Sequence, residues 1–349
     1  MSAVLRALML VVVSAMAAGA LGSARAQGAT AEAGSTGSTR IMIVGDSITH
    51  GSTGDYTWRY RLWQHLRSAG EDVDLVGPRT DLWNYLRSRP GDQRYAVRGF
   101  DRDHRARWGD SYTRLAPEIR GMVAAHQPDY LVVELGFNDL LWCCSPERTL
   151  ELLRAFLDEV YAASPGVVTI VTTVPSTRLA AAPAFNDLLL ASEPDLRSEH
   201  PGVIVADTAA GFRTRRHTFD GTHPNANGEL VIAAGVADAL AEVGVGTPAQ
   251  RPLPVLPVGP SVASVLRVRA GDREAILRWR PAPGATRHFV WVRGPGGRRW
   301  TRLPHAVTGR SRTIGGLVNG RRYTFRVQAA KVRAVSPLRS LPVRVVPHR

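Results

Sequence analysis

Two short polar motifs, far apart in the chain, carry side chains that together could cleave an ester. Ser47 lies in Gly-Asp-Ser-Ile-Thr at residues 45–49, and His223 lies in Asp-Gly-Thr-His-Pro at residues 220–224. A serine hydroxyl needs a base before it attacks a carbonyl, because it is barely ionised near neutral pH. His223 could be that base, and Asp220 could orient its ring. The pattern therefore predicts a catalytic triad of Ser47, Asp220 and His223.

Two further segments could hold the negative charge that forms on the ester oxygen. Asn138 follows the apolar run at residues 130–135, and its amide could donate a hydrogen bond worth about 2.7–4 kcal/mol in the transition state. Gly109 lies in a loop-like stretch and offers a bare backbone N–H, which makes it a better candidate than Gly99. The predicted oxyanion hole consists of the Ser47 and Gly109 N–H groups and the Asn138 amide.

Each motif alone also has an ordinary structural explanation. Gly-Asp-Ser is a common turn sequence, and residues 136–139 could form a tight turn. The Asp220 motif could be a loop that enters a helix capped by Asn225 or Asn227. Ser111 is interpreted as a polar loop or helix-start residue rather than a second nucleophile. The ordered occurrence of all the motifs, each at a predicted strand end or in a loop, favours catalysis.

The elements that must position these residues alternate between strands and helices. The run at residues 41–44 is short, apolar and bounded by glycine, which indicates a buried parallel strand with Ser47 just beyond its carboxyl end. In open parallel sheets such ends form the ligand crevice. Further strands are predicted at 73–76, 130–135, 167–174 and 203–206, and helices at 60–69, 115–126, 146–163, 184–191 and 229–243. This alternation predicts a parallel sheet with helices on both faces.

These motifs resemble the SGNH, or GDSL-type, hydrolases, a family named after a serine, a glycine, an asparagine and a histidine in separate blocks. The corresponding residues here are Ser47, Gly109, Asn138 and His223. The resemblance covers about residues 40–240. It implies a three-layer α/β/α, flavodoxin-like domain that hydrolyses esters and requires no cofactor and no metal.

Within that family, residues 40–51, 60–61 and 73–77 look most like secreted carbohydrate esterases that deacetylate xylan. Trp108 stands where such relatives usually carry a small residue, so it affects the expected shape of the acyl pocket. The nucleophile-elbow hydrolases are disfavoured, because they need a glycine where Thr49 stands.

Residues 80–99 are rich in Arg, Asp, Gly and aromatic residues and are predicted to form an inserted surface loop. Trp83 and Tyr85 could stack on sugar rings there. Packing of the loop by its own aromatic residues is the favoured interpretation.

The chain of 349 residues is long enough for about two domains. Residues 1–26 have the charged start, apolar run and Ala-Arg-Ala end of an export signal, and we expect residues 27–39 to form a flexible segment after it. No later stretch reaches ~20 apolar residues. We therefore expect a secreted monomer that is not an integral membrane protein, with a retained amino-terminal anchor as the alternative.

The formal net charge is +14, yet Lys331 is the only lysine among the 44 Lys and Arg residues. Such a preference for arginine is typical of a GC-rich genome and need not reflect an acidic partner. The positive charge could still favour acidic wall polymers or anionic lipid. Because no nucleic-acid-binding motif accompanies the charge, we expect no nucleic-acid partner.

The two cysteines, Cys143 and Cys144, are adjacent. A vicinal disulfide, an intermolecular disulfide and two free thiols are all open. No spacing of cysteine and histidine matches a zinc motif. Five other histidines are interpreted as ordinary loop or surface residues, with a crevice-lining role open for the third: His50, His65, His104, His126 and His217.

The carboxyl-terminal part has a different pattern. A hydrolase domain at residues 40–243 is followed by a Pro- and Gly-rich linker at residues 244–260. Residues 261–349 contain short alternating runs between turns, which predicts a small all-β, immunoglobulin-like sandwich. Trp279 and Tyr323 resemble the core tryptophan and corner tyrosine of a fibronectin type III domain. This domain could be a spacer or could hold the protein near a cell-wall or polysaccharide surface.

The prediction that results is a secreted serine esterase for small esters and, above all, for acetylated polysaccharide. A secreted lipase or lysophospholipase is the alternative among enzymes. A noncatalytic glycan- or cell-wall-binding protein is the alternative of another class.

Overall fold

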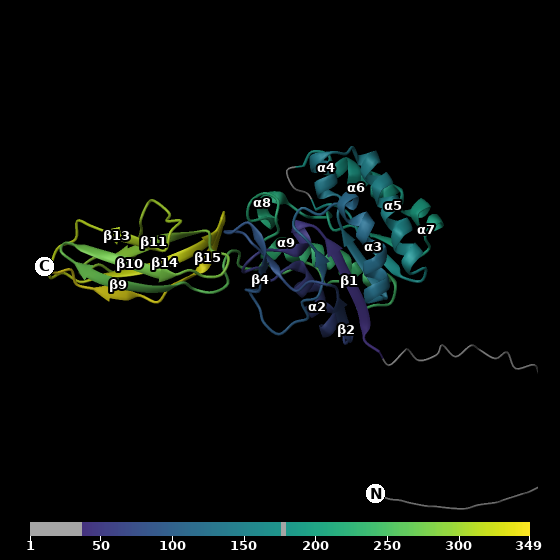
Figure 1. The fold of residues 1–349 in the computed structure, drawn as a ribbon. Coiled ribbons are helices and arrows are strands. Elements are labelled where there is room, and N and C mark those ends of the chain that lie inside the picture. Colours follow the sequence, from purple (N-terminus) through teal and green to yellow (C-terminus); the bar gives the residue numbers. More distant parts are fainter. Residues whose placement is uncertain (1–36, 176–178) are drawn as a thin grey trace, which may run out of the picture. The chain divides into compact units, whose positions relative to one another are not determined.

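The centre of the hydrolase region is a parallel β-sheet with strand order β2-β1-β6-β7-β8 (Figure 1). A computed structural model describes residues 37–175 and 179–349. The predicted export signal and nearly all of the segment at residues 27–39 lie outside the described residues. The strands are β1 (Thr39–Gly45), β2 (Val73–Val76), β6 (Tyr130–Glu134), β7 (Val168–Thr172) and β8 (Val203–Ala206). All five predicted strands are confirmed.

A short strand, β5 (Arg105–Ala106), joins this sheet at the carboxyl end of β1. It pairs in parallel with the last two residues of β1, Val44 and Gly45. The sequence pattern indicated only a loop here, because two residues are too few to show a period. The pairing carries the segment that follows, with Gly109, toward the carboxyl end of β1.

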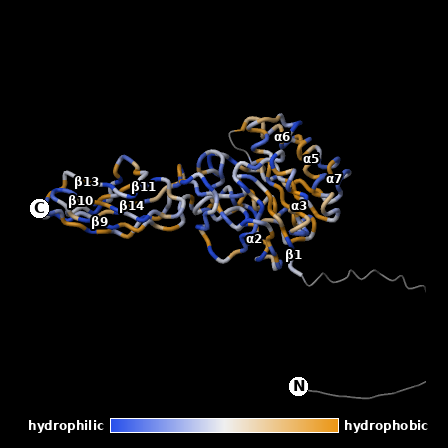
Figure 2. Tube along the Cα trace, viewed as in Figure 1, coloured by the Kyte–Doolittle hydropathy of each residue, from blue (hydrophilic) through white to orange (hydrophobic). Residues whose placement is uncertain are grey.

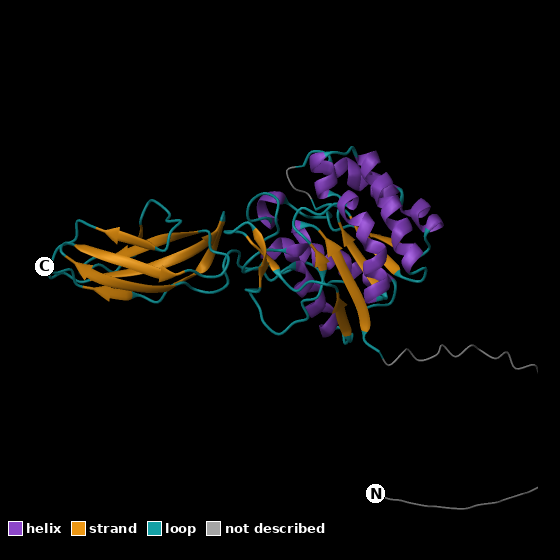
Figure 3. Cartoon of the chain, in the orientation of Figure 1, coloured by secondary structure: helices purple, strands orange, loops and turns teal. Residues whose placement is uncertain are grey.

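Helices cover both faces of the sheet, as predicted (Figure 3). On one side α3 packs on α5 and α5 on α6, and on the other side α2 packs on α9. The long helices are α2 (Trp58–Ser68), α3 (Tyr112–His126), α5 (Pro146–Ala163), α6 (Ala182–Ala191) and α9 (Ala226–Glu242). The shorter ones are α1 (Ser47–His50), α4 (Phe137–Trp142), α7 (Glu193–Glu199) and α8 (Thr214–His217).

The hydrophobic core lies between these layers. Figure 2 shows hydrophobic residues along β1 and along the helices that pack on the sheet. Ile41, Ile43 and Val133 are fully buried, because helices exclude water from both sides of the strands. No helix among the described residues combines the length and the hydrophobicity that a membrane crossing requires.

The carboxyl-terminal residues form two antiparallel sheets, which confirms the predicted all-β sandwich. One sheet has the order β13-β10-β9, and the other has the order β12-β11-β14-β15 with β16 beside β14. The strands are β9 (Val265–Gly271), β10 (Glu274–Arg280), β11 (Arg287–Arg293), β12 (Thr301–Arg302), β13 (Ser311–Ile314), β14 (Tyr323–Lys331), β15 (Ala334–Arg339) and β16 (Val343–Val345).

Trp279, Val290 and Phe325 pack in the core of this sandwich. The Tyr323 hydroxyl accepts a hydrogen bond from the Val318 N–H at 3.2 Å, the kind of bond that a corner tyrosine makes. The fibronectin type III assignment itself stays a prediction.

Residues 80–99 are more ordered than an inserted surface loop. They contain a hairpin of β3 (Leu82–Asn84) and β4 (Arg89–Asp92). Leu82 and Tyr95 are buried in a small hydrophobic cluster of their own. Residues 86–91 are exposed, as a surface insertion predicts, but the hairpin and the burial of Leu82 and Tyr95 were not predicted.

The predicted linker also packs, in part, on the hydrolase domain. Val245 joins the main hydrophobic core, and the Ala249 N–H donates to the Asp238 carboxylate of α9 at 2.8 Å. No helix or strand lies between α9 and β9 in the structure.

Candidate active site

Ser47 is the first residue of α1 and lies directly beyond the carboxyl end of β1. The Asp46 side chain caps this helix, since its Oδ1 accepts from the Ile48 N–H at 2.8 Å. A Cβ atom on Gly45 would lie 2.8 Å from the Glu134 carbonyl oxygen, so only glycine fits between the two strands here. The tight turn leaves Ser47 at the sheet edge, with 5% of its surface exposed.

His223 and Asp220 lie near the carboxyl end of the domain's sequence but contact the Ser47 site. The Ser47 Oγ lies 3.1 Å from His223 Nε2, and His223 Nδ1 lies 2.7 Å from Asp220 Oδ2. The second carboxylate oxygen of Asp220 accepts from the His223 backbone N–H at 2.8 Å. The three residues predicted from sequence therefore form a continuous hydrogen-bonded chain.

Asp220 remains ionised at neutral pH. Burial alone would raise its pKa, but the hydrogen bond and the charge of His223, together with two backbone N–H groups, lower the pKa to about 2. An ionised carboxylate at Nδ1 holds the proton there and leaves Nε2 free to accept one. The dyad is thus set for His223 to act as a base toward Ser47.

Gly109 follows Trp108, whose indole stacks on the His223 ring. Its φ of +83° lies in the left-handed region that favours glycine. The neighbouring Trp108 N–H donates to His50 Nδ1 at 3.2 Å, and the Asp110 N–H donates to the Arg107 carbonyl at 3.0 Å. No described residue accepts a hydrogen bond from the Gly109 N–H, which leaves it available to a ligand.

Asn138 is buried at the start of α4, which follows β6. Its Nδ2 donates to the Asp110 carbonyl at 2.7 Å and, over a longer distance of 3.2 Å, to Asp46 Oδ2. The amide therefore points toward the residue after Gly109 and toward the residue before Ser47. To donate to an ester oxygen it would have to exchange the longer of these bonds.

Two buried carboxyl groups, Asp46 and Glu134, lie near Ser47. Burial, with the charges of Asp139 and Asp110, raises the pKa of Asp46 to about 8, and burial with the Asp46 charge raises the pKa of Glu134 well above its usual value. Glu134 Oε2 accepts from Thr49 Oγ1 at 2.6 Å. Sequence reasoning passed over Glu134, although an acidic residue inside an apolar strand was a visible signal.

An aromatic wall borders His223. Trp108 stacks on the imidazole with ring centroids 4.2 Å apart, and Trp83 stacks on Trp108 at 5.1 Å. The Tyr85 ring meets Trp108 and Phe219 edge-on. Trp83 and Tyr85 therefore pack against the catalytic loops and not merely within their own loop, which corrects the favoured prediction.

Three of the histidines interpreted as loop or surface residues are buried: His50 and His104 fully, and His217 with 7% exposure. His50 Nδ1 accepts from Trp108 and His104 Nδ1 accepts from the Ala106 N–H at 3.0 Å. The backbone donors explain the burial. Through them His50 and His104 hold the segment that carries Gly109.

His50 and His104 also share Asp81, and ligand atoms of the three lie within 4.8 Å of one another. Both ring nitrogens of His104 are already engaged, since Nε2 donates to the Asp81 carbonyl at 3.0 Å. The nearby charges of Arg59 and Arg79 lower the pKa of His104, after burial, and would oppose a cation. His50 Nε2 lies 3.6 Å from the Asp81 carboxylate. The engaged His104 nitrogens and the nearby guanidinium groups argue against a metal site here.

Smaller predictions at the site edge are resolved as well. Ser111 caps α3 and Asn225 caps α9, so both are structural, as interpreted. Cys143 and Cys144 form a vicinal disulfide at the end of α4.

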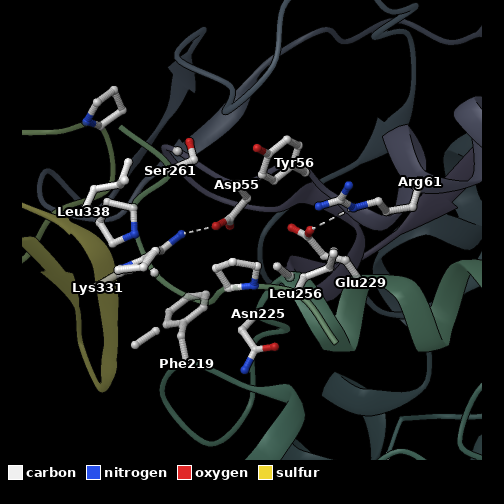
Figure 4. A pocket seen from close by; sticks show the side chains of 18 residues that line it. Asp55, Tyr56, Arg61, Phe219, Asn225, Glu229, Leu256, Ser261, Lys331 and Leu338 are labelled. Carbon is white, nitrogen blue, oxygen red and sulfur yellow. Dashed lines mark hydrogen bonds and ion pairs between the residues drawn. The ribbon is translucent and has the colours of Figure 1, made fainter. Parts of the chain in front are cut away.

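Two cavities adjoin the triad region. A small one of about 10 Å³ is lined by Ser47, Trp108 and His223 and extends to Asp55 and Glu229. A larger one of about 320 Å³ lies between the hydrolase domain, the linker and the sandwich (Figure 4). Asp55 and Glu229 line both.

Comparison with known proteins agrees with the fold of the amino-terminal part of the described chain. A model of the GDSL-like Lipase/Acylhydrolase family matches residues 43–230, more than half of the chain. A family 3 carbohydrate esterase from Clostridium thermocellum has a similar structure (TM-score 0.50, 23% identity, 59% of this chain and 97% of that one). Another from Talaromyces cellulolyticus has a TM-score of 0.49 and 29% identity, covering 59% of this chain and 97% of that one.

Two curated proteins are similar over part of their length. A multidomain esterase from Ruminococcus flavefaciens is 26% identical over 219 residues, which are 55% of this chain and 27% of that protein. Thioesterase 1/protease 1/lysophospholipase L1 from Escherichia coli K12 is 27% identical over 134 residues, 38% of this chain and 63% of that protein. The chain thus spans less than two thirds of both. The family match establishes that this chain belongs to the GDSL-like lipase/acylhydrolase family.

Proposed function

We propose that this protein is a serine esterase that releases short acyl groups, above all acetyl, from hydroxyl groups of carbohydrate. The observation that carries the proposal is the chain of contacts from Ser47 Oγ to His223 Nε2 and from His223 Nδ1 to Asp220. The family and the named activities of the relatives support ester hydrolysis.

In the first step His223 Nε2 takes the Ser47 proton while Oγ attacks the ester carbonyl. The tetrahedral intermediate collapses, His223 returns the proton to the departing alcohol, and an acyl-enzyme remains. Water, deprotonated by the same imidazole, then attacks the acyl carbon, and the imidazolium returns the proton to Ser47 Oγ as the acid is released. Asp220 stabilises the imidazolium throughout without taking the proton.

The oxyanion that forms in both steps needs donors on one side of Ser47. The N–H of Ser47 has no acceptor within α1, because the first residues of a helix lack intrahelical partners. The Gly109 N–H and the Asn138 amide complete the proposed set. Removal of one such donor costs about 2.7–4 kcal/mol in activation free energy.

The small cavity supports a preference for acetyl. Its volume of about 10 Å³ is about the smallest space that holds a single water molecule. Trp108 fills the space beside it and is itself held by Trp83. A methyl group is the acyl substituent that such a space accommodates, and a longer chain would have to displace the indole.

An exposed tryptophan supports a sugar as the alcohol. Trp142 is 58% exposed, and its indole edge lies 3.5 Å from where a Cβ atom on Gly109 would stand. It follows Asn138 by four residues, so both lie on one face of α4. An aromatic face at this position could stack on the sugar ring that bears the ester. We further propose that residues 1–26 direct export.

The test is hydrolysis of p-nitrophenyl esters from acetate to palmitate, with Ser47→Ala in parallel. A Ser47-dependent preference for acetate, followed by release of acetate from acetylated xylan, is the expected result. A preference for long chains would replace the proposal by a lipase or lysophospholipase. Wild-type-like rates in Ser47→Ala would contradict the mechanism. If the wild type hydrolysed none of the esters and did not react with a serine-directed phosphonate, the result would favour a binding protein.

A further inference from the structure

A turn of the sandwich contacts the hydrolase domain next to the nucleophile. Lys331, at the end of β14, has a side chain that is only 5% exposed. Its Nζ donates to Ser52 Oγ at 2.7 Å and to the Thr53 carbonyl at 3.3 Å, and it forms an ion pair with Asp55 (Figure 4). All three partners lie in the loop that directly follows α1, the helix that begins with Ser47.

The same turn also contacts the segment that leads into the acid–base pair. The Arg333 backbone N–H donates to the Phe219 carbonyl at 3.1 Å, and its guanidinium donates to Thr218 Oγ1 at 3.1 Å. Thr218 and Phe219 immediately precede Asp220. Phe219 is in turn tied to His223, since its N–H donates to the His223 carbonyl at 3.0 Å.

Lys331 reaches this second segment as well. Its Nζ lies 4.3 Å from the centre of the Phe219 ring, a cation–π distance. The Phe219 ring stacks on the His223 imidazole with centroids 5.8 Å apart. One ammonium group therefore links the loop after the nucleophile to the ring beside the base.

The backbones approach each other closely at this junction. A Cβ atom on Gly54 would lie 2.6 Å from the Pro283 carbonyl oxygen, and one on Gly284 would lie 2.2 Å from the Thr53 carbonyl oxygen. Beyond these contacts the surfaces separate around the cavity of about 320 Å³. The turn at Lys331 is thus a defined point of attachment and not a loose tether.

The identity of Lys331 is informative because the chain otherwise uses arginine for its long cationic side chains. A buried cation must recover its lost hydration through hydrogen bonds and a counter-charge. An ammonium group is compact and offers three donors, whereas a guanidinium group is a wide planar fork. Ser52, Thr53 and Asp55 together match the compact group.

We propose that the sandwich positions the catalytic site. Lys331 and Arg333 fix the loop that follows α1 relative to the segment that leads into Asp220 and His223. This inference rests on the proposed esterase function. Lys331 acts through Ser52, Thr53 and Phe219 and is a positioning residue. A displacement of about 1 Å between reacting groups can cost up to 100-fold in rate.

The test uses the full chain and p-nitrophenyl acetate. For Lys331→Met we expect kcat to fall at least about tenfold, with KM within about twofold of the wild type, because alignment and not binding is lost. The rate of labelling by a serine-directed phosphonate should fall in parallel. Arg269→Met, an exposed change on β9 of the same sandwich, is the matched control and should leave kcat unchanged.

A double variant separates positioning from simple charge balance. Lys331→Met with Asp55→Asn removes both buried charges, so the melting temperature should recover while kcat stays low. The inference would be overturned if the double variant recovered both its melting temperature and its kcat. It would also be overturned by a kcat for Lys331→Met within twofold of the wild type.

Arg333→Ala provides the test if the lysine variants do not fold. Arg333 is exposed, and the hydrogen bond from its backbone N–H to the Phe219 carbonyl remains in the variant. We expect a loss in kcat of a few fold, and an unchanged kcat would count against the proposal. These outcomes differ from failure of the proposed function, in which the wild type itself would be inactive.

Discussion

The two β regions of this protein bury their strands in different ways. In β1 every residue from Ile41 to Gly45 is buried, because helices cover both faces of the sheet. In β10 burial alternates along the strand, because one face packs on the second sheet and the other meets solvent. A doubly covered sheet has little room for reactive side chains on its faces, so Ser47 and Asn138 lie just beyond strand ends. The sandwich instead meets the catalytic site through a turn.

The regions also differ in their buried ionisable groups. Buried acids with raised pKa lie beneath the hydrolase site, among them Asp46 and Glu229. The sandwich buries a base, His288, whose pKa burial lowers to about 4. In both regions burial favours the neutral form, but the two cases have opposite consequences for stability against pH.

The largest expected effect follows from removing charge at the strand-end site. Asp220→Asn should lower kcat toward p-nitrophenyl acetate by about 10⁴-fold, because the imidazole loses its orienting carboxylate. The control is Asp272→Asn in the sandwich, where the exposed carboxylate accepts a hydrogen bond from Asn319. Steady-state kinetics of both variants measures the effect. A loss of less than tenfold for Asp220→Asn would show that His223 does not depend on this carboxylate.

Acyl selectivity should change when the aromatic wall is opened. Trp108→Ala should raise the ratio of butyrate to acetate hydrolysis by about 10- to 100-fold, since a few methylene groups in an apolar pocket are worth that much. The ratio of kcat/KM values for the two p-nitrophenyl esters is the measurement. An unchanged ratio would mean that another part of the site limits the chain length.

An added side-chain atom should destabilise the protein more at the end of β1 than in a loop of the sandwich. Gly45→Ala places a Cβ atom 2.4 Å from Thr49 Oγ1 and should destabilise the protein by about 1–3 kcal/mol. At Gly294 nothing lies within 4 Å of the added atom, so Gly294→Ala should stay within about 0.5 kcal/mol. Urea unfolding of the two variants gives the comparison. Equal stability of both would contradict the close strand contact.

Glu229 in the hydrolase domain and His288 in the sandwich should make stability depend on pH in opposite directions. Burial and the Asp55 charge raise the pKa of Glu229 to about 7 from 4.5, so the stability present below pH 4.5 is lost as the pH rises toward 7. The low pKa of His288 means that stability is lost as the pH falls from 6.5 toward 4.

Calorimetry from pH 4 to 8 measures these contributions. Glu229→Gln should make the stability of the hydrolase domain depend less steeply on pH, although Asp46, whose pKa is also raised, still contributes. An unchanged slope in the variant would show that Glu229 makes no such contribution.

The smallest expected effect concerns the exposed Trp142. Trp142→Ala should raise KM for acetylated xylan by about threefold to tenfold, the worth of one stacking contact, with p-nitrophenyl acetate kinetics within twofold. Leu141→Ala, an equally exposed neighbour, is the control. A rise in KM for both substrates would indicate a change in the catalytic centre and not the loss of a sugar contact.

Sequence reasoning was most successful where a pattern is local. The runs at β1, β2 and β8 are short and apolar, and the triad residues stand directly in recognisable motifs, so their placement followed from spacing. The short helices α1 and α4 were missed, because four to six residues show no helical period. The buried His50 was misread as a surface residue, since its partner Trp108 is 58 residues away.

By itself the sequence determined the order of strands and helices, the motifs that carry Ser47, Asp220 and His223, and the presence of a second, all-β region, because hydrophobic period and motif order are properties of neighbouring residues. Only the tertiary structure decided which donors hold Gly109, how Trp108 narrows the space at Ser47, and that Lys331 meets a loop 276 residues earlier in the chain. These contacts join segments that no local pattern connects, since their energy arises from burial and hydrogen bonding after the layers have packed.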